Sequence, residues 1–422
     1  MKLKKQHLLH IPLCAILVGA TGCSTFVQKK VSADELSKAY TRTATAQPTV
    51  TDEFKTSFTD FSLTTFRETV KGGTGNKLFS PLSAALCLAL VNNGANGETR
   101  AQLESLFGME TDELNRTMYA FTENLYSSDD CKLNIANSIW MKENALQVNP
   151  AFLQTNADWY GAQAYSAPFN GNTLQDINNW CHNQTQGKIS KILNDIPNDA
   201  VMYLINAVDF DAKWQVKYER GDIEQGIFHN DNGTNSEVVM LHSEESRYFI
   251  DDNSVGFAKN YMDNKYSFMA LLPDEGVDIY EYIESLNGEK WAGLLESGDY
   301  NRADYEWREV HARIPEFSYE IELSLNAILQ SLGVTDMFDP MKADFSGIDS
   351  TQPLWCDTVK QKAIIEVDRN GTKAAAITWA GVKCMGAAPA KELYITLDRP
   401  FVYAIVENEH HLPIFIGAVT NL

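Results

Sequence analysis

Apolar residues along this chain recur in two kinds of pattern, one typical of helices and one typical of strands. A spacing of three or four residues predicts helices, over residues 52–70, 82–91, 97–107, 112–127, 150–160, 174–193, 278–297 and 323–332. Alternating or continuous apolar runs predict strands, over residues 132–141, 200–210, parts of 249–272, 310–319, 362–367, 401–406 and 414–419. The two kinds are interspersed, which favours an α+β fold with a large mixed sheet.

The stretch 367–385 combines loop-like ends with strand-like alternation. From Thr372 to Val382, every second residue is small or β-branched and uncharged, namely Thr372, Ala374, Ala376, Thr378, Ala380 and Val382. The intervening set is mixed and carries Lys373 and Lys383. Because a strand sends alternate side chains to opposite faces, this stretch fits a sheet with its small face inward. The turn dipeptide Asn370–Gly371 and the small residues after position 385 instead fit an Ala-rich surface loop or a short helix.

Charge and cysteine content narrow the classes of function. The formal net charge is −21, which argues against binding to nucleic acid or anionic lipid, since both need a basic face. The seven cysteines are scattered, with no C-x-x-C and no histidine pair at ligand spacing, so neither a metal site nor a cofactor is expected. Cys384 differs from the others because it sits in the loop-like stretch, where it would be open to oxidation.

The first fifty residues predict export. A basic start precedes an apolar run over 13–20 that is too short to span a membrane. Residues 20–23, Ala-Thr-Gly-Cys, resemble a bacterial lipobox, although Ala20 stands where Leu is usual. We therefore predict a lipoprotein signal peptide over 1–22, a lipidated Cys23 with a flexible polar tether to residue 49, and one folded domain over 50–422. A simple secretory signal is the alternative.

The candidate catalytic residues belong to no recognised motif. Several histidines would serve as a base if a nucleophile lay beside them, namely His182, His242, His311, His410 and His411. The chain has no G-x-S-x-G and no cysteine-protease signature. The glycines within 72–75 are not followed by Gly-Lys-Ser/Thr, so they indicate a turn rather than a phosphate-binding loop. These observations predict a protein that is not an enzyme.

Five ordered motifs resemble those of the serpins, a family of serine protease inhibitors. They are N-K-L-F-S-P-L-S over 76–83, the strand over 204–214, the glycine- and alanine-rich hinge over 371–378, D-R-P-F over 398–401 and F-I-G-A-V over 415–419. They follow in serpin order and at serpin distances from about residue 50 to Leu422. The resemblance implies a serpin fold, with a large mixed main sheet, two smaller sheets, about eight or nine helices, and an exposed reactive loop over about 369–392.

The resemblance also assigns residues to the region where the main sheet opens. Asn206 lies in a continuous apolar run and needs partners, because a buried unsatisfied amide costs about 1–3 kcal/mol. The implied partners are Ser80, Ser83 and Gln361, with Gln361 in place of the usual His. Trp214 belongs to the same region. The implied hinge consists of Gly371, Thr372, Ala374, Ala375, Ala376 and Thr378.

The position of the reactive bond is implied by the number of residues that usually separates this bond from the hinge in the family. That distance places it at Met385–Gly386, with Lys383–Cys384 as the alternative register. Met385 suits elastase-, chymotrypsin- or subtilisin-like proteases, Lys383 suits trypsin-like ones, and the residues before the bond also suit papain-like ones. Arg369 and Lys373 depart from the usual Glu, and Ile377 replaces a small residue. All three fall on or beside the outward set, where we expect tolerance.

The function implied is suicide-substrate inhibition of serine endopeptidases, with cysteine endopeptidases as further targets. The cut loop would enter the main sheet as a new strand and trap the acyl-enzyme. A non-inhibitory serpin that acts as a binding protein with a cleavable loop is the alternative, and the small inward set favours the inhibitor. We expect a monomer. In some serpins the helix that corresponds to 112–127 is basic and binds heparin, but here it is acidic, so we expect no heparin activation. The expected location is a bacterial membrane, through the lipid anchor and on the periplasmic or outer face, or otherwise the secreted fraction.

Overall fold

The computed structural model describes residues 27–40, 42–43, 49–71, 73–125, 127–298, 308–372 and 391–422. Within them are nine α-helices: α1 (Asp52–Val70), α2 (Pro81–Asn92), α3 (Gly97–Phe107), α4 (Thr111–Asn124), α5 (Pro150–Tyr160), α6 (Gly171–Gln184), α7 (Ile279–Ser285), α8 (Gly288–Ser297) and α9 (Asn326–Ser331). Short 3-10 helices are η1 (Ser37–Ala39), η2 (Arg220–Asp222), η3 (Met262–Asn264) and η4 (Asp336–Phe338).

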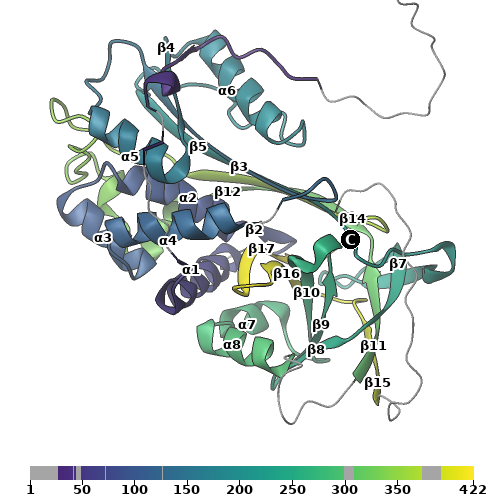
Figure 1. The fold of residues 1–422 in the computed structure, drawn as a ribbon. Coiled ribbons are helices and arrows are strands. Elements are labelled where there is room, and N and C mark those ends of the chain that lie inside the picture. Colours follow the sequence, from purple (N-terminus) through teal and green to yellow (C-terminus); the bar gives the residue numbers. More distant parts are fainter. Residues whose placement is uncertain are drawn as a thin grey trace, which may run out of the picture.

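Among the described residues the strands form four hydrogen-bonded sheets, of five, six, four and two strands, and the five-stranded and two-stranded ones together make the main sheet. The main sheet has the order β1-β4-β3-β5-β14, and the pair β12-β13 lies alongside it (Figure 1). Its strands are β1 (Asp34–Glu35), β3 (Cys131–Lys142), β4 (Gln163–Ala167), β5 (Met202–Lys213), β12 (Phe317–Ser324), β13 (Lys360–Val367) and β14 (Gly371–Thr372). Parallel pairing of β3 with β4 and antiparallel pairing of β3 with β5 make the sheet mixed.

The two smaller sheets carry most of the C-terminal half. The six-stranded sheet has the order β2-β17-β16-β10-β9-β8, with β2 (Lys77–Phe79), β8 (Arg247–Ile250), β9 (Ser254–Asn260), β10 (Tyr266–Pro273), β16 (Phe401–Glu407) and β17 (Leu412–Val419). The four-stranded sheet has the order β15-β11-β7-β6, with β6 (Ile223–His229), β7 (Asn235–Glu245), β11 (Arg308–Pro315) and β15 (Lys391–Thr396). The predicted α+β class with a large mixed sheet is confirmed.

The core lies between the helices and the sheets. Every residue of β10, β16 and β17 is buried, which explains why their sequences are continuously apolar rather than alternating. Helix α2 is apolar on all sides because it packs against both β5 and β17. It begins sharply at Ser80, whose hydroxyl accepts a bond from the backbone N–H of Ser83, and Pro81 occupies the first turn.

Three predicted elements differ from the structure. The helix predicted over 174–193 ends at Gln184, because Gln186 and Gly187 take positive φ and the Thr185 hydroxyl accepts the N–H of Ile189. The helix predicted over 278–297 is two helices, divided where Asn287 caps α8. The strand predicted over 310–319 is two strands, and β12 continues through residues predicted to begin a helix. In the helical cases apolar residues continue beyond the break in the backbone, whereas in the strand the apolar alternation shifts from even positions up to Ile314 to odd positions from Phe317.

The segment before residue 50 is docked where the structure describes it. Strand β1 pairs with β4 at the edge of the main sheet, and Leu36 donates to the carbonyl of Ala164 at 2.8 Å. The Asn183 amide on α6 bonds both backbone groups of Lys29, at 2.8 and 2.7 Å. The sequence predicts a flexible tether here, whereas residues 27–40 pack on the folded domain. A polar segment carries no sign in its own sequence that an edge strand elsewhere will pair with it.

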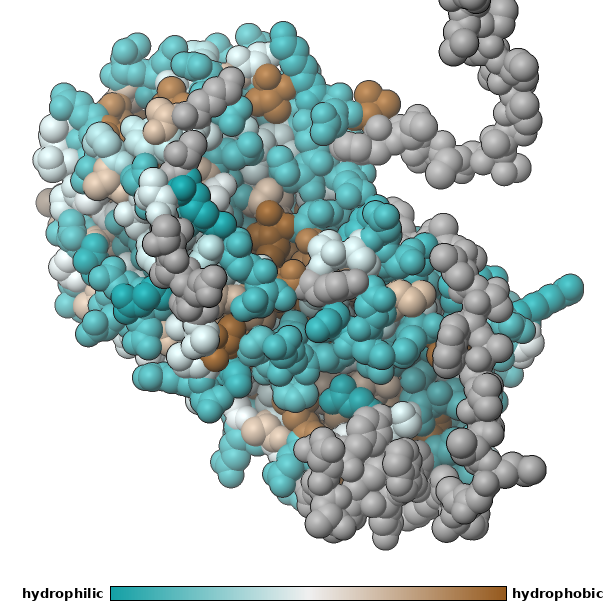
Figure 2. All heavy atoms as spheres, in the orientation of Figure 1, coloured by the Kyte–Doolittle hydropathy of each residue, from teal (hydrophilic) through white to brown (hydrophobic). Residues whose placement is uncertain are grey.

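The visible face of the molecule is mainly hydrophilic, with hydrophobic residues in small separate patches (Figure 2). This surface agrees with the acidic composition. Among the described residues, no helix has both the length and the apolar character needed to cross a membrane.

Candidate functional site

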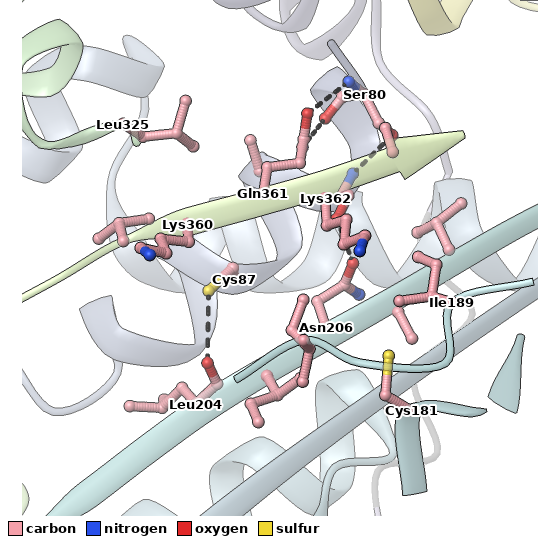
Figure 3. Close-up of a pocket in the computed structure, with 18 of the residues that line it drawn as sticks. Ser80, Cys87, Cys181, Ile189, Leu204, Asn206, Leu325, Lys360, Gln361 and Lys362 are labelled. Carbon is pink, nitrogen blue, oxygen red and sulfur yellow. Dashed lines mark hydrogen bonds between the residues drawn. The ribbon is translucent and has the colours of Figure 1, made fainter. Parts of the chain in front are cut away.

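A slot separates β5 from β13 within the main sheet. The two strands run side by side, yet β13 is hydrogen-bonded to β12 and β5 to β3 and β14 (Figure 3). A cavity of about 80 Å³ lies in the slot, lined by residues of α2, β5, β13 and the segment after α6. Strand edges that face each other without pairing leave room for a further strand.

Both walls of the slot are tied to the first turn of α2. Ser83 donates its hydroxyl to the Asn206 amide oxygen at 2.6 Å, which holds β5. Gln361 on β13 accepts the backbone N–H of Ser80 and donates to its carbonyl, both at 2.8 Å. The structure thus brings the four predicted residues together, but Asn206 bonds Ser83 and Asn137, whereas Ser80 and Gln361 bond each other.

One flank of the slot is covered by the segment that follows α6. Lys188 in this segment makes ion pairs with Asp209 at 2.6 Å and Asp211 at 3.3 Å, both on β5. Ile189 and Ile192 line the cavity next to them. The cover is therefore held on β5 by charges, and it lies over the same wall that a new strand would contact.

The first two hinge residues, Gly371 and Thr372, lie at one end of the slot. A tight turn over 368–371 reverses the chain after β13, and β14 then pairs with β5, with Gly371 opposite Lys213 and Thr372 opposite Ala212. Gly371 has a φ of +144°, and a Cβ there would lie 2.2 Å from the carbonyl oxygen of Ala212. Only glycine permits this close approach. Thr372 is 5% exposed, so its side chain is buried in this arrangement.

Aromatic side chains hold this turn from the core side. Trp214 is fully buried and donates its indole N–H to the carbonyl of Asp368 at 2.8 Å. Its ring stacks on Tyr261 with centroids 4.6 Å apart and planes 9° apart. The hydroxyl of Tyr261 lies 2.8 Å from the hydroxyl of Thr372. The family motifs assign Trp214 to this region, but they miss Tyr261, which follows β9 and carries no local signal of the hinge.

An ion pair braces the outer side of the same turn. The Arg369 guanidinium contacts both oxygens of Glu316, at 2.8 and 3.0 Å, and the backbone N–H of Arg369 donates to the same carboxylate. The hydrogen bonds to Glu316 raise the pKa of Arg369. The structure thus supplies a partner of opposite charge for a residue that departs from the family's usual Glu.

The remaining predicted site residues lie outside the described part of the chain. They are both candidate reactive bonds, Met385–Gly386 and Lys383–Cys384, the hinge residues Ala374, Ala375, Ala376 and Thr378, and the lipidation residue Cys23. Among the described cysteines, burial raises the pKa of Cys87 to about 11 and that of Cys181 to about 12. Both line the cavity and stay protonated at neutral pH.

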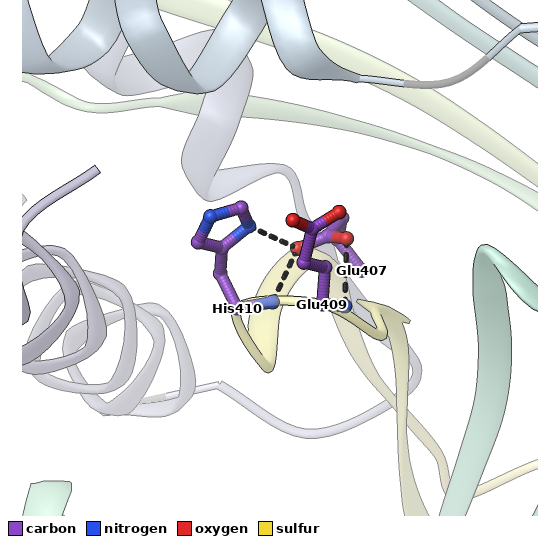
Figure 4. A group of neighbouring side chains, drawn as sticks. All are labelled: Glu407, Glu409 and His410. Carbon is purple, nitrogen blue, oxygen red and sulfur yellow. Dashed lines mark hydrogen bonds and ion pairs between the residues drawn. The ribbon is translucent and has the colours of Figure 1, made fainter. Parts of the chain in front are cut away.

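A cluster of Glu407, Glu409 and His410 sits at the turn between β16 and β17 (Figure 4). It is the one group of potential metal ligands of this size among the described residues. Glu407 is buried, and its carboxylate accepts the backbone N–H groups of Glu409 and His410 and contacts the His410 ring at 3.0 Å. These bonds explain the cluster as a brace for the turn.

Comparisons with known proteins agree on one family. A family model described as "Serpin (serine protease inhibitor)" matches residues 56–422. Leukocyte elastase inhibitor A of Rattus norvegicus is 30% identical over 364 residues, covering 82% of this chain and 93% of that protein. Serpin B11 of Homo sapiens is 27% identical over 396 residues, covering 86% and 97%.

Solved structures give the same result. The thermophilic serpin tengpin in its native state superposes with a TM-score of 0.85 at 39% identity, covering 93% of this chain and 100% of that one. The latent state of the same protein gives 0.78 at 40% identity, with 89% and 100% covered. A thyroxine-binding globulin complex shares the fold, with a TM-score of 0.74 at 23% identity and coverage of 87% and 98%.

Proposed function

Because the chain belongs to the family described as "Serpin (serine protease inhibitor)", we propose that it is a suicide-substrate inhibitor of endopeptidases. The protease nucleophile attacks the reactive bond in the loop, forms an ester or thioester with the carbonyl carbon and releases the new amine. The cut loop then enters the slot as a strand between β5 and β13, and carries the acylated protease with it. A strand adds readily at this place, because the backbone groups of β5 and β13 do not pair across the slot.

The observation that carries this proposal is the register of β14. Thr372 pairs with Ala212, so a ladder that continued in step would place residues 374, 376, 378 and 380 opposite Phe210, Val208, Asn206 and Leu204. The first set is Ala374, Ala376, Thr378 and Ala380, all small. In the second set, Phe210 belongs to the main core, and Val208 and Leu204 are partly buried and pack against it. Small residues would therefore lie beside apolar side chains that already pack against the core, where large ones are harder to fit.

The same register accounts for the departures from the family pattern. Lys373 would stand opposite Asp211, whose carboxylate already attracts Lys188. Ile377 and Trp379 would stand opposite Ala207 and Ile205, which belong to the second apolar cluster beneath α6. The larger and charged residues thus meet partners of matching chemistry once the cover after α6 shifts.

The energy available is sufficient. A strand of about a dozen new hydrogen bonds, at about 0.5–1.5 kcal/mol each, gives on the order of 10 kcal/mol. This is comparable with the whole stability of a typical domain. Insertion would therefore be effectively irreversible and strong enough to distort a bound protease.

The test is to mix the purified protein with elastase, trypsin, subtilisin and papain, followed by a denaturing gel and intact mass measurement. We expect a complex that survives denaturation, with a released fragment that begins at Gly386 or at Cys384 and so identifies the register. Cleavage without a complex and without a rise in the unfolding temperature would favour the non-inhibitory binding protein instead.

We also infer that the chain is exported and anchored through a lipid on Cys23. The lipobox-like residues 20–23 support this inference. Metabolic labelling with a fatty acid, compared between the wild type and Cys23→Ala in the native host, tests it. Label on the wild type alone is expected, and an unlabelled, freely secreted chain would favour a simple secretory signal.

A further inference from the structure

Tyr261 is held against the hinge residue Thr372, although it belongs to a distant part of the chain. The residue lies between β9 and η3 and is fully buried. Its ring stacks on Trp214 and meets Phe210 edge-on at 5.1 Å, and its backbone N–H donates to the carbonyl of Tyr266 at 3.0 Å. These contacts fix the ring so that its hydroxyl points toward Thr372, at 2.8 Å.

The two aromatic residues together hold both ends of the hinge turn. Trp214 bonds the carbonyl of Asp368, where the turn begins, and Tyr261 bonds the side chain of Thr372, the second residue of β14. Thr372 also pairs with Ala212 on β5. The first residues of the strand that insertion must build are therefore already in register on the slot wall.

A strand that is already started extends faster than one that must begin. Ordering the first residues of a ladder costs backbone entropy before later hydrogen bonds compensate for it. In suicide inhibition this rate matters, because the acyl-enzyme is either trapped by insertion or hydrolysed to free protease and spent inhibitor. A faster start raises the trapped fraction and leaves the rate of the initial cut unchanged.

We propose that Tyr261 is a positioning residue for inhibition: its buried hydroxyl holds Thr372 on β5, so that insertion starts from a formed nucleus and outpaces hydrolysis of the acyl-enzyme. The inference rests on the proposed inhibitory function. Tyr261 would then influence whether the acyl-enzyme is trapped or hydrolysed, although the residue lies outside the reactive loop and outside the walls of the slot.

The primary test is Tyr261→Phe, which keeps the ring stack and removes the hydroxyl. We expect the number of inhibitor molecules consumed per protease trapped to rise by about threefold to tenfold, the change in a rate ratio that one buried hydrogen bond supports. The rate of loop cleavage should stay unchanged. An unchanged partition would overturn the proposal.

Two sets of variants separate positioning from general destabilisation. Tyr282→Phe removes another buried tyrosine hydroxyl, which contacts Ser254 at 2.8 Å away from the hinge. It should lower the unfolding temperature without changing the partition, and an equal change in both variants would overturn the proposal. Thr372→Val should raise the consumption of inhibitor as much as Tyr261→Phe does, whereas Thr372→Ser, which keeps the hydroxyl, should trap protease as the wild type does. The double variant Tyr261→Phe/Thr372→Val should consume no more inhibitor than either single variant.

Hydrogen exchange of the intact protein distinguishes this inference from the proposed function. Peptides covering 368–372 should exchange faster in Tyr261→Phe than in the wild type if the hydroxyl holds β14, and equal exchange would overturn the hold itself. If the wild type traps no protease, the inhibitory function fails, and the exchange result alone then decides whether Tyr261 holds the hinge.

Discussion

Reversal of the ion pair between Arg369 and Glu316 is the sharpest test of how the hinge turn is held. The pair is bidentate, and its side chains are 45% and 22% exposed. Exposed pairs stabilise proteins by about 0.2–1 kcal/mol, and bidentate geometry puts this one at the upper end. Arg369→Glu removes that contribution and adds repulsion of similar size from Glu316 and Asp368. We therefore expect a loss of about 2 kcal/mol in the free energy of unfolding.

The assay is thermal unfolding followed by circular dichroism at low salt and at about 1 M salt, where exposed charges are screened. For a chain of this length, the loss corresponds to about 2–4 °C at low salt. The double variant Arg369→Glu/Glu316→Arg should recover stability to within about 0.5 kcal/mol. Lys360→Glu is the matched control, because it breaks a more exposed pair with Glu322, between β13 and β12, and should cost less. A double variant as unstable as the sum of the two single variants would refute the reasoning.

Three further predictions follow from other contacts. Thr372→Arg would place a charge at a position that is 5% exposed, at a cost of several kcal/mol, so the variant should be cleaved without trapping the protease. Full yield of the complex would contradict insertion, and Ser318→Arg, at an exposed site, is the control. Burial raises the pKa of Asp349, but hydrogen bonds from Thr351, Gln147 and Gln352 outweigh it and hold that pKa below its usual value of 3.8. The contribution of Asp349 to the free energy of unfolding is therefore complete above pH 3.8 and is lost as the pH falls toward the folded pKa. Asp349→Asn should flatten the acid side of the plot of stability against pH, and an unchanged acid side would contradict this. Removal of residues 1–43 would expose the edge of β4, so light scattering should show more association than for the full chain at the same concentration, and equal scattering would contradict this.

Local pattern was sufficient for elements that keep at least one face against the core along their whole length. Helix α1 occupies the predicted residues 52–70, and the continuous run over 200–210 is strand β5 in the main sheet. These elements have one face, or both faces, against the core along their whole length, so spacing and conformation agree. Where the backbone breaks while apolar spacing continues, as between α7 and α8, pattern alone misses the break.

The hinge illustrates the boundary between what the sequence determined and what the tertiary structure decided. The small alternating residues from Thr372, the glycine before them and the family motifs around them are local or ordered features, so they could be recognised in the chain itself. The contacts that hold the hinge join distant residues: Arg369 and Glu316 are 53 positions apart, and Thr372 and Tyr261 are 111 positions apart. Such partners are selected only when distant strands pack together, because no local propensity specifies which side chain will meet a given backbone turn.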